Sequence, residues 1–231
     1  MAERLTRGQL GLACGITAAA GFVDGVGFIH LGGYFVSFMS GNSTRAAADL
    51  ASGDLLGWVR ALGLVLAFVF GVVLASLVSH RMESTTIQEA TAIRPQLRAI
   101  WLSAAVLALA AVCGSLYLLG AGDGWWFAVA PLIALAMGAV NATFTRGGEV
   151  SVGLTYMTGA LVKAAQHFAA LLRGSPNTVW LRYAALWSAI AVGSAAGAVC
   201  YLTWDLWSLW IAVLGLLACA ATIRLRRPGQ A

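Results

Sequence analysis

GFVDGVGFIHLGGYFVSFMSGNSTR, residues Gly21–Arg45, is the stretch from which the fold can be predicted. It places one acid, Asp24, inside an apolar run and interrupts that run with glycines. The chain restarts after Gly41 and Asn42, and Arg45 follows about one helical turn later. Broken helices with buried polar groups are typical of transporter sites, because irregular backbone is tolerated in a membrane only where it is buried or lines a cavity.

A second stretch repeats this pattern further along the chain. Gly138–Lys163 reads GAVNATFTRGGEVSVGLTYMTGALVK and begins 117 residues after the first stretch (138 minus 21). The matching positions are Gly21–Asp24 with Gly138–Asn141, Phe38–Gly41 with Tyr156–Gly159, Arg45 with Lys163, and Asn42 with Ala160. We therefore interpret residues 1–231 as a single integral membrane domain with two repeats, about 9–119 and about 125–224.

The composition identifies a membrane protein. Hydrophobic residues make up 60% of the 231 residues and charged residues 10%, whereas an ordinary globular domain has about 25% charged residues. Several apolar runs reach about 20 residues, which is long enough to cross a hydrocarbon layer of about 30 Å. The lipid bilayer is therefore an expected partner. The net charge of +5 does not indicate nucleic-acid binding, because the arginines stand at the ends of the apolar runs.

The apolar runs predict six transmembrane helices. They cover about residues 9–28, 55–78, 99–119, 125–144, 180–201 and 206–223. Two further segments, 34–51 and 150–173, each contain a short helix. The first is too polar and too short to span a membrane comfortably, and the helix of the second carries Lys163 and His167. We leave open whether these two segments are re-entrant, interfacial or spanning, and a chain in which both cross would have eight spans.

Basic residues predict the orientation. Cytoplasmic loops of membrane proteins are rich in lysine and arginine. The basic clusters are Arg4 and Arg7; Arg81, Arg94 and Arg98; Arg173 and Arg182; and Arg224, Arg226 and Arg227. With six spans, all of these clusters fall on the side of both termini, which we expect to be cytoplasmic. Each repeat then has an odd number of spans, so the repeats run in opposite directions. The expected fold is an all-α membrane protein of two inverted three-helix repeats, each with an additional short or broken helix.

Asp24 and Asn141 are the first candidate site residues. A carboxylate inside a membrane is costly, so it must be paired, protonated or in contact with water. Asp24 therefore either forms part of a substrate or proton site, or makes a structural salt bridge to Arg45 or Lys163. The two interpretations are compatible, and the sequence does not separate them.

The two short helices supply the other candidate binding residues. They begin near Gly41 and Gly159, and a helix N-terminus offers free N–H groups to an anion. Asn42 follows in the first helix, and Arg45 and Lys163 lie four residues after the two glycines. The functional interpretation is two opposed half-helices around a solute. The alternative is a pair of amphipathic surface helices with basic residues that reach toward the lipid headgroups.

His30, Glu149 and His167 are candidates for a proton relay. A lone histidine is more often a hydrogen-bonded packing residue than a ligand, and Glu149 could pair with Arg146. The chain contains no HExxH, GxSxG or P-loop motif and no metal-ligand spacing. We therefore expect no enzyme activity, no cofactor and no metal.

Stripes of small residues, Gly71 with Ala75 and Gly193 with Gly197, allow helix backbones to pack closely. They would serve either a homodimer contact or the packing of the two repeats within one chain.

The motifs also carry a family resemblance. Gly21–Asp24, the run from Phe35 to Asn42, and Thr155–Gly159 resemble the YoaK-like family of bacterial membrane proteins, over the whole chain. The resemblance implies a six-helix integral protein of the bacterial inner membrane and leaves the activity open. Ser40 stands where the family pattern has threonine.

From these observations we expect a secondary transporter or channel for a small polar solute, bound centrally between the two half-helices. Arg45 and Lys163 favour an anionic solute, and Asp24 would couple a proton or a cation. The alternatives from other classes are a non-transporting scaffold, sensor or lipid-binding protein, and then a membrane enzyme.

Overall fold

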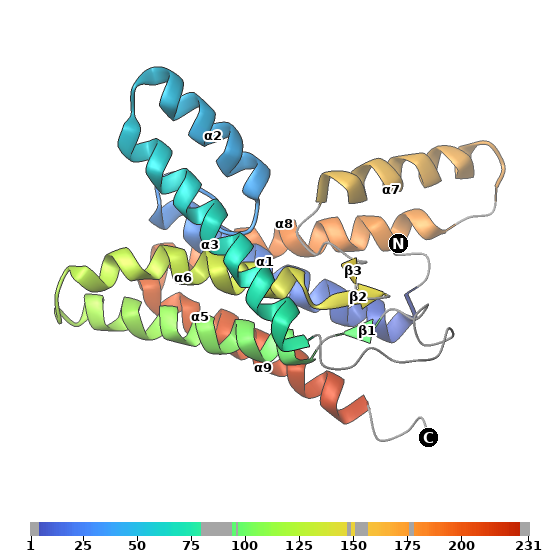
Figure 1. Cartoon of the computed structure of the whole chain (residues 1–231). Helices are drawn as coiled ribbons and strands as arrows, with labels where there is room; N and C mark the ends of the chain where they lie inside the picture. Colours follow the sequence, from blue (N-terminus) through green and yellow to red (C-terminus); the bar gives the residue numbers. More distant parts are fainter. Residues whose placement is uncertain are drawn as a thin grey trace.

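The structure is a computed structural model, and it describes residues 5–79, 94–95, 97–146, 149–150, 157–175 and 178–226. Within these residues the chain is helical except for turns, the segment 34–38 and one small sheet (Figure 1). The helices are α1 (Arg7–His30), α2 (Met39–Ser52), α3 (Leu55–Ser79), α5 (Leu97–Leu118), α6 (Gly124–Asn141), α7 (Met157–Leu172), α8 (Val179–Trp204), the 3-10 turn η2 (Asp205–Ser208) and α9 (Leu209–Arg226).

Five segments of the described chain are long and apolar enough to cross a membrane. Four of them are α1, α3, α5 and α6, and the fifth, Val179–Leu225, contains both α8 and α9 with η2 between them. The short helices α2 and α7, of 14 and 16 residues, are not among these segments. The prediction of an all-α, multi-pass membrane protein is confirmed.

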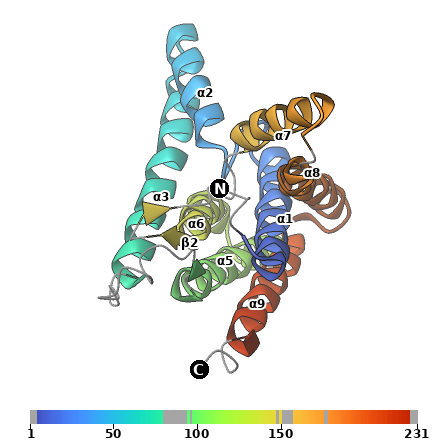
Figure 2. The same cartoon turned by 90° about the vertical axis from the view of Figure 1, so that its right-hand side faces the viewer.

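The long helices form a bundle whose members alternate in direction. In Figure 1, α1, α5 and α8 run from right to left, and α3, α6 and α9 run from left to right. Figure 2 shows α2 and α3 on one side and α7 and α8 on the other, with α1 and α6 between them. Each short helix therefore packs beside the long helix that follows it in the chain.

The crossing of α1 and α8 is made by glycines on both helices. A Cβ added at Gly21 would lie 2.3 Å from the carbonyl oxygen of Ile190, and one at Gly193 would lie 2.2 Å from that of Ala18. Side chains at these positions would force the helices apart. Close backbone approach of this kind is the usual role of small residues in membrane helices.

The crossing of α3 and α6 is also made by glycines on both helices. A Cβ at Gly71 would lie 2.0 Å from the oxygen of Leu135, and one at Gly138 would lie 2.0 Å from the oxygen of Phe68. Ala75 on the same stripe is fully buried. Of the two roles predicted for the glycine stripes, the structure therefore uses them to pack helices within one chain, and they are not left free for a homodimer contact.

Lipid contact is most evident on α3. Several of its large apolar side chains are more than half exposed, namely Leu55, Leu56, Val59, Leu66 and Phe70. Most of the fully buried large side chains come instead from α1, α5, α6 and α9, and include Ile16, Val23, Ile100, Leu107, Met137 and Leu216. An apolar surface of this kind contacts the acyl chains of the bilayer.

A small antiparallel sheet was not predicted. It pairs β1 (Arg94–Pro95) with β2 (Phe144–Arg146) and β2 with β3 (Glu149–Val150). The predicted fourth span corresponds to α6, which ends at Asn141, and residue 144 already belongs to β2. β1 pairs with a strand about 50 residues further along the chain. A local hydropathy pattern carries no information about pairing over that distance.

Candidate functional site

The chain between α1 and α2 turns sharply and then runs extended. Gly32 and Gly33 have φ values of +66° and +98°, in the left-handed region that glycine adopts readily. The following residues, Tyr34–Phe38, belong to no helix or strand, so their backbone N–H and C=O groups need other partners.

Asp24 supplies partners for the middle of this segment. Its Oδ1 accepts hydrogen bonds from the backbone N–H groups of Val36, at 3.0 Å, and Ser37, at 2.8 Å. The Ser37 hydroxyl donates to the other carboxylate oxygen. Asp24 is 7% exposed. The acid in the first apolar run therefore fixes the segment that breaks that run.

Asn42, on α2, holds the same extended segment through hydrogen bonds to Phe35. Its side-chain oxygen accepts from the N–H of Phe35 at 2.9 Å, and its Nδ2 donates to the Phe35 carbonyl at 2.6 Å. Asn42 is fully buried. The Asn42 amide therefore gives both backbone groups of Phe35 a hydrogen-bond partner. Its own polar atoms are paired at the same time, as is usual for a buried polar side chain.

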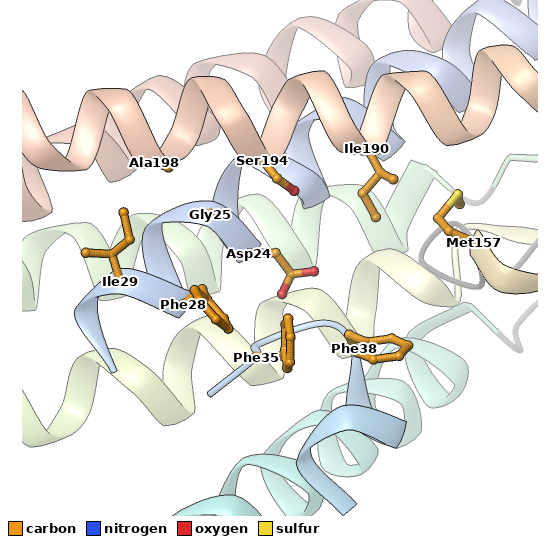
Figure 3. Close-up of a pocket in the computed structure, with 10 residues that line it drawn as sticks. All are labelled: Asp24, Gly25, Phe28, Ile29, Phe35, Phe38, Met157, Ile190, Ser194 and Ala198. Atoms are coloured by element: carbon orange, nitrogen blue, oxygen red, sulfur yellow. The ribbon is translucent and has the colours of Figure 1, made fainter. Parts of the chain in front are cut away.

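A pocket of about 410 Å³ opens beside Asp24. It is lined by Asp24, Gly25, Phe28, Ile29, Phe35, Phe38, Met157, Ile190, Ser194 and Ala198. Figure 3 shows the Asp24 carboxylate close to Phe35, with α8 above it and Met157 at one end. Sites for small ligands have volumes of about 300–1,000 Å³ and combine an apolar lining with few polar groups. The pocket fits that description.

Both short helices begin at this pocket. Phe38 is the residue before α2, and Met157 is the first residue of α7. Gly41, in the first turn of α2, has no room for a side chain, since an added Cβ would lie 2.7 Å from Phe38 and 2.9 Å from Phe35. Gly159 occupies the first turn of α7. The structure therefore brings the two predicted helix starts to one cavity.

Arg45 does not line the pocket. Its Nε donates to Oδ1 of Asp49 at 2.8 Å, and its guanidinium lies 4.7 Å from the centre of the Tyr34 ring. The Tyr34 hydroxyl donates to the other oxygen of Asp49 at 2.9 Å. Burial, and then this bond to the Asp49 carboxylate, raise the pKa of Tyr34. The interpretation of Arg45 as the partner of Asp24 is therefore wrong.

Lys163 and His167 also lie elsewhere. Lys163 Nζ is 5.7 Å from the centre of the Tyr183 ring, and His167 stacks on that same ring with a centroid distance of 5.7 Å and an interplanar angle of 8°. The alternative salt bridge from Lys163 to Asp24 is absent, and no other described cation pairs with Asp24.

The remaining candidates are dispersed. Nδ1 of His30 lies 3.0 Å from the Tyr201 hydroxyl, and its Nε2 is buried with no hydrogen-bond partner among the described residues. Asn141 Nδ2 donates to the Met137 carbonyl of its own helix at 2.9 Å. Glu149 is described only through its backbone in β3. In the described part of the chain, Asp24 is hydrogen-bonded to Val36 and Ser37 and not to these candidates.

The aromatic wall of the pocket was not predicted. Phe28, Phe35 and Phe38 were not among the predicted site residues, although all three lie within 14 positions of Asp24 (38 minus 24). Ser194 was also missed, although it follows Gly193 of the predicted glycine stripe. Both signals were present in the sequence, but only the folded chain shows which side chains face one cavity.

Metal chemistry finds no support in the described residues. Among them, no group of three or more histidine, cysteine, aspartate or glutamate side chains could hold a metal ion.

Comparison with known proteins gives the family. A family model described as "Protein of unknown function (DUF1275)" matches residues 12–222. UPF0700 transmembrane protein RA0705 of Rhizobium meliloti (strain 1021) is 31% identical over 222 residues, which cover 96% of this chain and 89% of that protein. No solved structure matches the chain. The resemblance to an uncharacterised family of bacterial membrane proteins is confirmed, and the chain, a multi-pass membrane protein, belongs to the DUF1275 family.

Proposed function

We propose that this protein is a secondary transporter or channel for a small polar solute, which binds in the pocket beside Asp24. The observation that carries the proposal is that the residues lining the pocket come from both halves of the chain. Asp24, Phe35 and Phe38 come from the first half of the chain, and Met157, Ile190 and Ser194 come from the second half. A cavity shared by two halves that can move against each other is the arrangement that alternating access requires.

The expected anionic character of the solute gains no support. The cations on which it rested, Arg45 and Lys163, lie against Asp49 and Tyr183 and do not line the pocket. We therefore retain a small polar solute and drop the preference for an anion.

We further propose that the chain consists of two inverted repeats, about residues 9–119 and 125–224, with six spans. Equivalent residues make equivalent contacts: Gly21 approaches the Ile190 carbonyl, and Gly138 approaches that of Phe68. Gly138 lies 117 positions after Gly21 (138 minus 21), and Ile190 lies 122 positions after Phe68 (190 minus 68). The opposite directions of α1 and α6, and of α3 and α8, also support the inversion (Figure 1).

The repeat proposal predicts the sides on which α2 and α7 end. We expect Ser52 to be outside and Ser175 to be cytoplasmic, because the basic clusters set both termini inside. In a chain whose four cysteines are replaced by alanine, Ser52→Cys should react with an impermeant maleimide in intact cells, and Ser175→Cys only after permeabilisation. Both serines are exposed. Protection of both in intact cells would instead support eight spans, since α2 and α7 would then cross.

Transport itself predicts access to the pocket from both sides. In the same cysteine-free chain, we expect Ser194→Cys to react with an impermeant maleimide in right-side-out and in inverted vesicles. The physical reason is that a transporter or channel opens its site to both aqueous phases. Val192→Cys, on the exposed outer face of α8, is the matched control and should stay unreactive from both sides if that face contacts lipid. Reaction of Ser194→Cys from one side alone would favour a sensor or a scaffold.

A further inference from the structure

Among the described residues, the pocket has a single ionisable lining residue, and that residue is an acid. Of the described residues that line it, only Asp24 and Ser194 have polar side chains, and the others are apolar or glycine. An anionic ligand would therefore meet the Asp24 carboxylate without a compensating cation from the described lining, in surroundings where charge repulsion is poorly screened.

The charge of Asp24 also lacks a counter-ion in the described part of the chain. Its three donors, the N–H groups of Val36 and Ser37 and the hydroxyl of Ser37, are all neutral. Arg45, the cation nearest in sequence, pairs with Asp49 instead. An intramembrane carboxylate is stable when a cation or a proton balances its charge.

An aromatic wall stands next to this carboxylate. The ring centroids of Phe28 and Phe35 are 5.1 Å apart, and those of Phe35 and Phe38 are 5.2 Å apart. Phe28 is 44% exposed and Phe38 is 40% exposed, so their rings are accessible to a ligand. Aromatic faces attract cations. Organic ammonium groups suit such a site best, because they give up little hydration energy when they leave water.

A bare metal cation fits this lining less well. Sodium-like and calcium-like ions need several oxygen ligands to replace their water, and calcium takes about 6–8 of them. The described lining side chains offer oxygens only from Asp24 and Ser194. Apolar side chains cover the rest of the wall and match the carbon skeleton of an organic molecule.

We propose that the pocket binds an organic cation, with an ammonium group at Asp24 and an apolar body against Phe28, Phe35 and Phe38. This assignment rests on the proposed function and names the class of its solute. The carboxylate contributes the charge complementarity, and the three rings contribute both apolar area and attraction for the cation. Ser194, on the α8 side, lies within the same lining.

The test measures binding of radiolabelled benzyltrimethylammonium to the purified full-length protein by equilibrium dialysis. We expect saturable binding that other aryl and alkyl ammonium ions displace and that benzoate does not. The uncharged isostere neopentylbenzene should compete weakly. Asp24→Asn, which removes the charge and keeps an acceptor for the backbone N–H groups, should weaken binding by about 30-fold or more. Asp49→Asn, at the other buried acid of this region, is the matched control and should leave the affinity unchanged.

A second variant keeps the test decisive if Asp24→Asn folds poorly. Phe28→Leu preserves an apolar surface and removes one aromatic face, so it should weaken ammonium binding about fivefold while leaving neopentylbenzene binding unchanged.

Three results would overturn the assignment: benzoate displacing the ammonium probe, neopentylbenzene binding as tightly as the ammonium, or no saturable ammonium binding to the folded parent protein. The failures can be told apart. Two-sided labelling of Ser194→Cys without ammonium binding would remove the substrate class and leave transport standing. Ammonium binding with one-sided labelling would leave a cation-binding site and remove transport.

Discussion

We expect Gly197→Ala to lower the free energy of unfolding by about 1–3 kcal/mol, the usual cost of overpacking a tightly packed site. The new Cβ would lie 2.0 Å from the carbonyl oxygen of Phe22 and 2.7 Å from its carbon, and both atoms are backbone. No side-chain rotation relieves such a contact, so α1 and α8 must separate. The measurement is a dodecyl sulfate titration of the purified protein in mixed micelles, followed by circular dichroism.

Two further alanines make this prediction specific. Gly71→Ala, 2.0 Å from the Leu135 oxygen at the crossing of α3 and α6, should cost about as much as Gly197→Ala. Gly63→Ala has nothing within 4 Å of the new Cβ and lies inside α3, so it should be neutral or stabilise the protein by about 0.5 kcal/mol through helix propensity. Equal effects of all three substitutions would show that close backbone packing does not hold these helices together.

Asp24→Ala should have the second large effect, a loss of at least about 3 kcal/mol of stability. The substitution leaves the N–H groups of Val36 and Ser37 and the Ser37 hydroxyl without their acceptor. A buried donor that loses its partner costs about 1–3 kcal/mol. The same titration measures the effect, and the yield of folded protein is the second readout if the variant does not purify.

Asp24→Asn separates the hydrogen bonds from the charge. The asparagine oxygen can still accept from the backbone N–H groups of Val36 and Ser37, so this variant should lose about 1 kcal/mol or less. Removal of a buried charge could by itself stabilise the protein. If Asp24→Ala proved as stable as Asp24→Asn, charge burial and not hydrogen bonding would dominate at this position.

The predictions for Gly197 and Asp24 concern two features of the same region of the fold. Glycines let α1 approach α8 closely, and Asp24 on α1 then holds the extended segment before α2. The pocket lies where these two features meet, since Gly25, Phe35 and Ser194 all line it. Stability and the candidate site therefore depend on the same short region, and only conservative variants such as Asp24→Asn can test binding without disturbing the fold.

The sequence by itself determined the membrane character, the positions of the long helices and the break after His30. Each depends on local properties: the length of an apolar run, the position of glycines, and the polarity of a short segment. The predicted helix near Gly41 appears as α2, which begins at Met39. The first predicted span agrees with α1 to within two residues at each end, because its boundaries are set by neighbouring residues in the chain.

The tertiary structure decided which side chains meet. The spacing of Arg45 and Lys163 after two helix starts predicted a cationic centre, but Arg45 pairs with Asp49 and Lys163 lies over Tyr183. Helical spacing fixes the face on which a residue lies, and the packing of other helices decides what that face contacts. The sheet between residues 94–95 and 144–146 and the shared pocket at Asp24 depend on segments far apart in the sequence, so only the folded chain could reveal them.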